Sequence, residues 1–397
     1  MNTPKIRFKG FTDDWEQRKL GEIVLRESLA RESTIDLPYV EYEDVIAEEG
    51  RINKDIRKKE GIKKGIFFDG SQVLYGKLRP YLHNWLNPDF SGVAVGDWWV
   101  LKPNNVDKNF IYRLIQTQQF DDIANQSTGS KMPRADWNLV SNTEFAIPTS
   151  QVEQTKIGGY FFTLDNLITL HQRKCDETKE LKKYMLQKMF PKNGEKNPEI
   201  RFEGFTDDWE QRKLIDYLDV SNEKNKKGDY KKTDVLSVSG EVGIVNQIEF
   251  QGRSFAGVSV ENYGIVNEGD VVYTKSPLKA NPYGIIKTNK GKAGIVSTLY
   301  AVYKPKENTD SDFVQIYFEL DSRMNSYMHP LVNKGAKNDM KVSDENALKG
   351  TVTFPKINEQ KAISNFITEL DHLITLHQRK CEKLKELKKF MLQNMFV

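Results

Sequence analysis

The chain consists of two copies of one framework around two different inserts. Residues 6–20, IRFKGFTDDWEQRKL, return as IRFEGFTDDWEQRKL at residues 200–214, with 14 of 15 positions identical. Residues 164–190 return at residues 370–396 with 21 of 27 positions identical. We call these repeated segments the opening and closing frames. Almost nothing between them aligns, so the fold must hold two unlike inserts in one repeated framework.

The closing frames keep polar residues as well as apolar ones. Packing constrains the apolar face of a helix and leaves its solvated face nearly free. Matching polar positions therefore indicate two equivalent surfaces that bind partners. A recent duplication is the alternative, although it should have left the inserts alike unless they diverged or were exchanged separately. The candidate partner-binding residues are Gln172, Arg173, Lys174, Lys182, Gln378, Arg379, Lys380 and Lys388.

Length and composition bound the class of protein. The 397 residues, 38% of them hydrophobic and 29% charged, are typical of a globular chain with two or three domains. No apolar run approaches the roughly 18 residues that cross a bilayer, and residues 1–10 show no signal-peptide core. We therefore expect a cytoplasmic protein without a membrane partner. Because the net charge is only +3, any nucleic-acid contact must use local patches.

Each insert is predicted to be an α+β globule. Short apolar runs separated by glycine and proline are typical of strands and turns. Apolar residues that recur at three and four positions predict short helices at residues 110–124 and 312–328. The predicted strands lie at residues 65–68, 73–75, 93–101, 235–238, 242–245, 271–273 and 295–303.

The closing frames belong to two long predicted helices. A series of mostly apolar residues steps alternately by four and three positions, which predicts a coiled-coil seam; it comprises Ile363, Ile367, Leu370, Ile374, His377, Cys381 and Leu384. A helix over residues 152–190 would be roughly 58 Å long at about 1.5 Å per residue. Two equivalent helices in one chain favour an antiparallel intramolecular pair related by a pseudo-two-fold, with one globule at each end. A parallel homodimer through each helix is the alternative.

This organisation resembles the specificity subunit of type I restriction-modification enzymes over essentially the whole chain. Each globule opens with a tryptophan, Trp15 or Trp209, followed by Glu-Gln-Arg-Lys-Leu. Each long helix is entered through a Pro-x-x-x-Glu-Gln-type segment, from Pro148 to Gln154 in the first copy, which has one residue more, and from Pro355 to Gln360 in the second. One local departure is that Gly-Glu-Ile follows the first opening frame, whereas Ile-Asp-Tyr follows the second.

The resemblance implies a DNA-binding subunit without catalytic activity of its own. Two target recognition domains, residues 1–150 and 193–355, would each read one half of an asymmetric, bipartite site in double-stranded DNA. Two spacer helices, residues 151–192 and 356–397, would set the distance between the halves and dock two modification subunits. Those partners would bring S-adenosylmethionine and methylate adenine, and restriction subunits would supply ATP- and Mg-dependent cleavage, so no cofactor is expected in this chain.

Basic residues beside glycines and aromatics are the candidate DNA contacts, because Arg and Lys bind phosphate and guanine while glycine lets the backbone approach closely. Two Tyr-x-Lys segments and two Gly-x-Lys loops recur in the two inserts. A solvated loop charge or an ordinary turn is the alternative at each position. The candidates are Lys77, Arg79, Gly129, Lys131, Arg134, Lys275, Gly335, Lys337 and Lys341.

The sequence offers one possible set of metal ligands and no catalytic motif. His171 and Cys175 lie four residues apart, and their counterparts His377 and Cys381 could complete a zinc set, but all four occupy seam positions, so no metal site is predicted. There is no phosphate-binding glycine loop, and Asn281-Pro-Tyr is interpreted as a turn. A DNA-binding adaptor of another machine, or a protein scaffold that binds no DNA, remains the alternative function.

Overall fold

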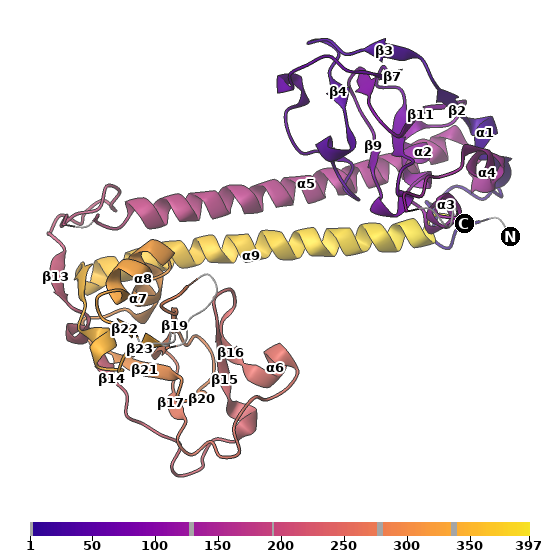
Figure 1. Cartoon of the computed structure of the whole chain (residues 1–397). Coiled ribbons are helices and arrows are strands. Elements are labelled where there is room, and N and C mark those ends of the chain that lie inside the picture. The colour runs from indigo at the N-terminus through magenta and orange to yellow at the C-terminus, as the bar shows by residue number, and fades with distance from the viewer. Residues whose placement is uncertain (1–2, 127–130, 193, 276–280, 335–339) are drawn as a thin grey trace. The chain divides into compact units, whose positions relative to one another are not determined.

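The computed structural model describes residues 3–126, 131–192, 194–275, 281–334 and 340–397. The chain divides into two compact units (Figure 1). Unit 1 comprises residues 1–173 and 377–397, and unit 2 comprises residues 174–376. Both divisions fall inside the long helices α5 (Gln151–Lys188) and α9 (Ile357–Asn394), because each insert packs on the start of one helix and the end of the other.

Unit 1 is built on an antiparallel sheet of four strands in the order β2-β11-β8-β9. The inner strand β8 is buried along its whole length, as expected for a strand between two neighbours. A second four-stranded sheet, β3-β7-β10-β4, carries a separate apolar cluster. The strands are β2 (Val24–Glu27), β3 (Ala30–Glu32), β4 (Tyr39–Val40), β7 (Lys64–Phe68), β8 (Val73–Gly76), β9 (Trp85–Leu86), β10 (Gly92–Ala94) and β11 (Trp98–Pro103), with the hairpin β5 (Val45–Ile46) and β6 (Arg51–Ile52) beside them.

Unit 2 has an equivalent first sheet, β14-β21-β18-β19, but a different periphery. In place of the second four-stranded sheet it has separate two-stranded ribbons. The sheet strands are β14 (Leu218–Val220), β18 (Val271–Thr274), β19 (Ile286–Thr288) and β21 (Tyr300–Pro305); the ribbons pair β15 (Leu236–Ser239) with β16 (Gly243–Asn246), β17 (Gly264–Val266) with β20 (Gly294–Val296), and β22 (Asn333–Lys334) with β23 (Met340–Lys341).

The opening frame of each unit pairs with the strand that leads into the long helix. β1 (Glu16–Lys19) runs antiparallel to β12 (Glu144–Ile147), and β13 (Glu210–Lys213) runs antiparallel to β24 (Thr351–Phe354). The register is the same in both, because Glu16 and Glu210 each oppose the last residue of the partner strand. Each insert therefore leaves and re-enters the framework at a single two-stranded ribbon.

Short helices pack against the first sheet in both units, α2 on β8 and β11 and α7 on β18 and β19. Asp107 and Asp310 cap α2 and α7 by accepting a hydrogen bond from the third helical N–H. The short α-helices are α1 (Leu20–Ile23), α2 (Lys108–Leu114), α3 (Gln118–Ala124), α4 (Trp137–Asn142), α6 (Gln247–Gln251), α7 (Ser311–Tyr317) and α8 (Asp321–Met328). The 3-10 helices are η1 (Tyr42–Asp44), η2 (Ile56–Lys58), η3 (Pro80–Leu82), η4 (Leu214–Asp216), η5 (Lys232–Asp234) and η6 (Asn346–Leu348).

The repeated tryptophans anchor equivalent aromatic cores. Trp15 packs edge-on against Phe110 and against Phe396 from the end of α9. In unit 2 Trp209 packs in the same way against Phe313 and Phe190 from the end of α5. Both tryptophans are 2% exposed, so each opening frame is fixed against the residues that directly follow a long helix.

Within each unit the two helix segments run antiparallel. In unit 1 successive contacts join Ile168 to Cys381 and Phe161 to Phe396, so the partner number rises as the first falls. In unit 2 Cys175 faces the Ile374 carbonyl and Lys182 contacts Asp371 in the same sense. The predicted seam positions Ile157, Phe161, Leu164 and Ile168 of α5, and Ile363, Ile367, Leu370 and Cys381 of α9, are buried.

Candidate nucleic-acid interface

The structure brings three predicted DNA contacts of unit 1 into one cluster. Leu78 forms an antiparallel bridge with Arg134, which places Lys77, Arg79 and Arg134 on neighbouring segments. The Arg79 amide donates to the Pro133 carbonyl at 2.7 Å, and the Ala135 amide donates to the Lys77 carbonyl at 2.8 Å. Two sequence segments that were selected separately therefore form one basic surface.

Asp97 organises this basic cluster. Arg134 donates to both Asp97 carboxylate oxygens, at 3.1 and 3.0 Å, and the Lys77 ammonium lies 3.6 Å from the same carboxylate. The Arg134 guanidinium holds the pKa of Asp97 below its usual range, so Asp97 is charged at neutral pH. One carboxylate cannot neutralise two cations, and Arg79 adds a third positive charge. The cluster therefore remains attractive to phosphate.

Unit 2 contains a smaller version of the same arrangement. Lys275 follows strand β18 as Lys77 follows β8, and its backbone N–H donates to Leu299 across the sheet. The Lys275 ammonium lies 2.9 Å from Asp344, which belongs to the segment before β24. The Lys341 backbone pairs with Asn333 in the ribbon of β22 and β23. Each unit thus joins its Tyr-x-Lys segment to the segment that precedes its last strand.

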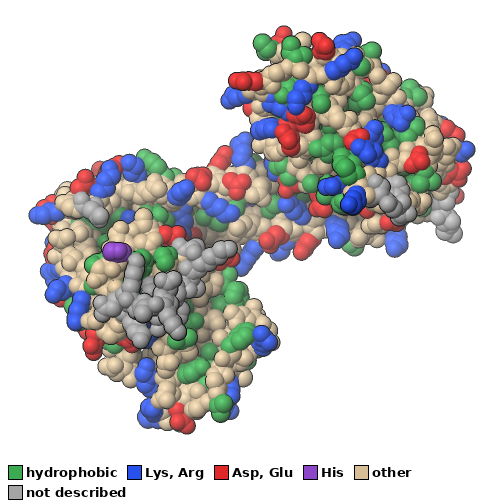
Figure 2. Space-filling view, in the orientation of Figure 1, with side chains coloured by type: hydrophobic (Ala, Val, Ile, Leu, Met, Phe, Trp, Pro, Cys, Tyr) green, Lys and Arg blue, Asp and Glu red, His purple; other side chains and the backbone are tan. Residues whose placement is uncertain are grey.

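The Gly-x-Lys loops are only partly covered by the structure. Lys131 is exposed and lies two residues before Pro133, whose carbonyl accepts from Arg79. Gly129, Gly335 and Lys337 lie outside the described residues. On the face of the unit 1 globule that Figure 2 shows, hydrophobic side chains lie directly beside Lys and Arg side chains.

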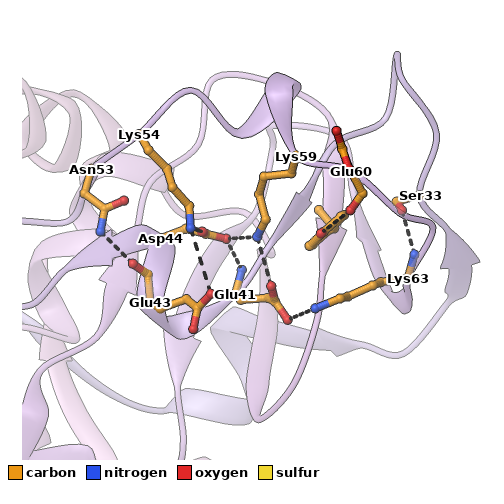
Figure 3. Close-up of polar contacts among 10 residues, drawn as sticks. Ser33, Glu41, Glu43, Asp44, Asn53, Lys54, Lys59, Glu60 and Lys63 are labelled. Carbon is orange, nitrogen blue, oxygen red and sulfur yellow. Dashed lines mark hydrogen bonds and ion pairs between the residues drawn. The ribbon is translucent and has the colours of Figure 1, made fainter.

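Three lysines of the first insert, Lys54, Lys59 and Lys63, are paired with carboxylates within the globule (Figure 3). Buried Asp44 contacts Lys59 at 2.6 Å and Lys54 at 2.9 Å, while Glu41 contacts Lys59 at 2.9 Å and Lys63 at 2.5 Å. Burial alone would raise the pKa of the Asp44 carboxyl, but its lysine and backbone partners lower it below its ordinary value. These lysines fasten the segment that contains η2, so they are poor candidates for phosphate contacts.

Two of the predicted partner-binding lysines turn inward. Lys182 is 8% exposed and contacts both Asp371 and Glu319 at 2.6 Å, within unit 2. Lys388 contacts Asp165 at 2.8 Å within unit 1. Their recurrence therefore has an intramolecular reason, namely an ion pair between the two helix segments. Arg173, Lys174, Gln378, Arg379 and Lys380 are exposed, and Gln172 is half-buried with its side-chain oxygen 3.7 Å from the Cys381 sulfur.

The Glu-Gln pair at each helix entry also has an internal role. Arg7 forms a bidentate ion pair with buried Glu153, at 2.6 and 2.8 Å. The Gln154 side chain donates to the Pro148 carbonyl and accepts from the Asp107 amide. The same contacts recur in unit 2. Arg201 forms a bidentate ion pair with Glu359, and the Gln360 side chain donates to the Pro355 carbonyl and accepts from the Asp310 amide. These residues fix the start of each long helix to its globule.

The seam histidines meet each other within unit 1. His171 Nδ1 and His377 Nδ1 are 2.9 Å apart, so one ring nitrogen donates to the other. Cys175 and Cys381 are buried free thiols, each 4.0 Å from a backbone carbonyl of the opposite helix segment. Across the described ranges, no group of three His, Cys, Asp or Glu side chains is arranged to hold a metal ion.

Several residues of the candidate binding surfaces were not predicted from the sequence. Asp97 and Arg113 were not predicted, because only the fold brings Asp97 beside its two cations and buried Arg113 beside the partly exposed carboxylate of Asp165. A set of exposed apolar residues on the long helices was also missed. Their signal was visible in the closing frames, because they recur at the same 206-residue offset and lie off the seam.

The two units therefore hold different globules on one repeated framework, and each globule has basic residues beside its Tyr-x-Lys segment, as expected for a protein that recognises DNA. The chain belongs to the family of the type I restriction modification DNA specificity domain, whose model matches residues 12–180 and again residues 206–386. The resemblance found in the sequence is thereby confirmed. None of the helices in the described part of the chain has the length and hydropathy needed to cross a bilayer.

Proteins similar to this chain are named as specificity subunits of type I systems. The MjaX specificity subunit of Methanocaldococcus jannaschii, a protein named for a type I restriction enzyme, is 23% identical over 96% of this chain and 87% of its own length. The S subunit of a type I restriction-modification system from M. genitalium shares the fold with a TM-score of 0.61 and 12% identity, covering 100% of this chain and 99% of that one. The HsdS subunit from Thermoanaerobacter tengcongensis has 17% identity, a TM-score of 0.44 and 96% coverage of both chains.

Proposed function

We propose that this chain is the DNA sequence-recognition subunit of a type I restriction-modification complex and has no catalytic activity of its own. Residues 1–150 and 193–355 act as two target recognition domains, and each reads one half of an asymmetric, bipartite site. The observation that carries this proposal is that equivalent frames hold unlike globules. Each globule joins its Tyr-x-Lys segment to the segment before its last strand, and that arrangement supplies basic side chains for DNA.

The spacer helices, residues 151–192 and 356–397, act as one antiparallel coiled coil in this proposal. The antiparallel contacts within each unit support it, because both units use equivalent seam positions. Such a pair sets the distance between two half-sites, since equivalent faces of B-DNA recur about every 34 to 36 Å. Inserting about four residues at the same level of both helices should change the tolerated gap and leave the half-site sequences unchanged.

An exposed apolar patch recurs on the helices of both units and supports the docking of two identical partners. Its eight members are large, apolar and between 37% and 53% exposed. Each of the four members on α5 has a counterpart in the patch 206 positions later, on α9. Unit 1 presents Leu167, Leu170, Leu387 and Phe390, and unit 2 presents Leu373, Leu376, Leu181 and Tyr184. Exposed apolar residues at helical spacing are typical of a binding surface.

Polar members of the predicted partner face border this patch. Lys380 lies seven residues before Leu387 in unit 1, and Lys174 lies seven residues before Leu181 in unit 2, which places each lysine on the patch side of its helix. An apolar centre with a charged margin is the usual organisation of a protein interface. Two modification subunits, which would bring S-adenosylmethionine, occupy these two surfaces in our proposal, and restriction subunits join the assembly through them.

Sequencing the methylated positions in cells that express this chain with its modification subunit tests the recognition role. We expect methylated adenine in a motif of two unlike halves separated by a fixed gap, and no such motif when the chain is omitted. A palindromic motif, or methylation that does not depend on the chain, would overturn the proposal. Specific DNA binding without methylation would instead favour an adaptor, and no DNA binding would favour a scaffold.

The docking surfaces can be tested one at a time. Leu387→Asp should remove the partner from unit 1, and Leu181→Asp should remove it from unit 2, so native mass spectrometry should show one modification subunit in place of two. Lys179→Asp is the matched control, because Lys179 is exposed on α5 about 200° around the helix from Leu181. Retention of both modification subunits by the two leucine variants would refute docking at these patches.

A further inference from the structure

A tight turn beside the basic cluster of unit 1 exposes two large apolar side chains. The turn runs from Arg79 to His83 and contains η3. Tyr81 is 52% exposed and Leu82 is 42% exposed, whereas Pro80 is buried beneath them. Water solvates a tyrosine ring and a leucine side chain poorly, so two adjacent ones at the tip of a turn indicate a contact surface.

The turn has an unusual backbone that is fixed at both ends. Arg79 and His83 both adopt positive φ, 49° and 53°, which residues other than glycine rarely do. The Arg79 amide is held by the Pro133 carbonyl, and the Leu82 and His83 amides donate back to Arg79 and Pro80 within the turn. A non-glycine residue keeps such a conformation only where its surroundings impose it, and strained residues of this kind concentrate at functional sites.

His83 supplies the second anchor of the turn. Its carbonyl accepts from the Glu48 amide at 3.0 Å, and its ring lies 3.0 Å from Asp121 and 3.3 Å from Glu48. The ring also stacks on Trp85, with centroids 5.3 Å apart. The imidazole thus joins the turn to α3 and to the segment after β5. Tyr81 and Leu82 are therefore presented on a rigid support.

The charges around the turn select the chemistry of its partner. Arg79 lies at its start, and the strand bridge brings Arg134 beside it. Lys131 is exposed two residues before the carbonyl that anchors Arg79. An apolar tip beside cations suits a polyanion that also offers flat apolar surfaces, and nucleic acid has both. An acidic protein surface would match the cations but would not match the tyrosine and leucine.

We propose that Tyr81 and Leu82 form an apolar wedge that inserts between two base pairs of the half-site read by unit 1. Apolar side chains that enter a base step unstack it and bend the duplex, and the contacts made on the bent DNA offset that cost. Arg79 and Lys131 would hold the flanking phosphates, and His83 is a positioning residue. This inference rests on the proposed function, because it assigns the wedge to a half-site of the bipartite target.

Duplexes with 2-aminopurine at single positions test the wedge. The full complex with its modification subunits binds a duplex that carries the methylation-defined target, with the probe at one position of the first half-site at a time. No probe is placed at the methylated adenine, because a methyltransferase rotates that base out of the helix by itself. We expect the fluorescence of one interior position to increase severalfold on binding, and probes in the second half-site to stay unchanged.

Paired substitutions connect that signal to the turn. Tyr81→Ala combined with Leu82→Ala should abolish the fluorescence increase and weaken binding to the target by about tenfold or more, the scale expected when a base loses an apolar stacking partner. Tyr81→Phe keeps the ring and should keep the signal. Ile35→Ala is the matched control, because Ile35 is also large, apolar and exposed in a loop of unit 1.

The outcomes separate this inference from the proposed function. A bipartite methylation motif together with a fluorescence increase that survives in the double variant, or no increase at any position, overturns the wedge alone. Loss of the motif itself overturns the proposed function and the wedge with it. His83→Ala removes a ring that we place away from the DNA. It should reduce the fluorescence increase and leave the sequence of the second half of the methylation motif unchanged. An unchanged fluorescence increase would contradict the positioning role of His83.

Discussion

The two units place the same lysine–aspartate pair in opposite electrostatic surroundings. In unit 1 the Asp165 carboxylate is shared by Lys388 at 2.8 Å and Arg113 at 2.7 Å. In unit 2 the Lys182 ammonium is shared by Asp371 and Glu319. The framework supplies the pair in both cases, because Lys388 and Asp165 are the repeat counterparts of Lys182 and Asp371.

The inserts supply the third charge and thereby reverse the balance. Burial lowers the pKa of Lys388, and Arg113 lowers it further against the opposing effect of Asp165. Burial also disfavours the charged form of Lys182, but Glu319 and Asp371 raise its pKa above the ordinary value. At the positions equivalent to Arg113 and Glu319 the other insert has Ile316 and Gln116. An insert can therefore alter the charge balance of the interior beneath it while the geometry of the framework stays the same.

Substitutions in the repeated framework should have the largest effect on the free energy of unfolding, and the loss should be the same in both units. Arg7→Met and Arg201→Met each leave an almost fully buried glutamate without its bidentate partner, so we expect a loss of about 3–5 kcal/mol of unfolding free energy in chemical denaturation. Arg18→Met, which removes exposed ion pairs, is the control and should have a much smaller effect. A large effect in one unit and a control-sized effect in the other would break the equivalence of the frames.

The buried lysines should respond unequally to the same substitution. Lys182→Met leaves Glu319 and Asp371 facing each other without their shared cation, and we expect a loss of about 2–3 kcal/mol after allowing for partial exposure of both carboxylates. Lys388→Met leaves Asp165 paired with Arg113, so its cost should stay below about 1 kcal/mol. Denaturation of the two variants under identical conditions measures the difference, and equal losses would contradict this account.

Alkaline pH should sharpen the same contrast. Because the pKa of Lys388 in the folded chain is lowered, its contribution to stability improves as pH rises through that value toward the unfolded value near ~10.4. Because the pKa of Lys182 is raised, its contribution is complete below ~10.4 and is lost as pH rises through the folded value. The free-energy gap between wild type and each methionine variant, measured from pH 7 to the alkaline limit, should therefore have opposite slopes.

The smallest predicted difference concerns the basic clusters. Asp97→Asn frees two cations in unit 1, and Asp344→Asn frees one in unit 2. We expect binding to random duplex to strengthen by roughly threefold for Asp97→Asn and by less for Asp344→Asn, with a steeper dependence on salt. Asp36→Asn, an exposed loop substitution with the same charge change, is the control. Equal affinities for the three variants would show that neither carboxylate restrains a DNA-binding cation.

Much of the framework was predictable from the sequence because its constraints are local. The alternating apolar positions predicted both long helices, and the predicted strands near residues 65 and 73 correspond to β7 and β8. The predicted helices at residues 110–124 and 312–328 are each two helices in the structure. In unit 1 the break falls where the Thr117 side chain bonds to Leu114 and caps α3, a capping effect that apolar spacing does not register.

The candidate site was less predictable because it depends on long-range pairing. Lys77 and Arg134 were selected from separate segments, and only the bridge between those segments makes them one cluster around Asp97. Lys182 and Lys388 were assigned to a partner surface because they recur, yet recurrence equally marks residues that hold the chain together. Telling the two apart requires the position of a distant carboxylate, which sequence spacing does not give.

The ribbons β1–β12 and β13–β24 have an evolutionary consequence. Each insert begins and ends on two strands that are hydrogen-bonded to each other, so its two junctions lie side by side. A replacement segment needs only to bring its own ends together at that ribbon, whatever sheets or loops it builds in between. Recombination at the repeated frames can therefore exchange one insert for another. Under the proposed function, such an exchange gives the complex a new target while its framework stays the same.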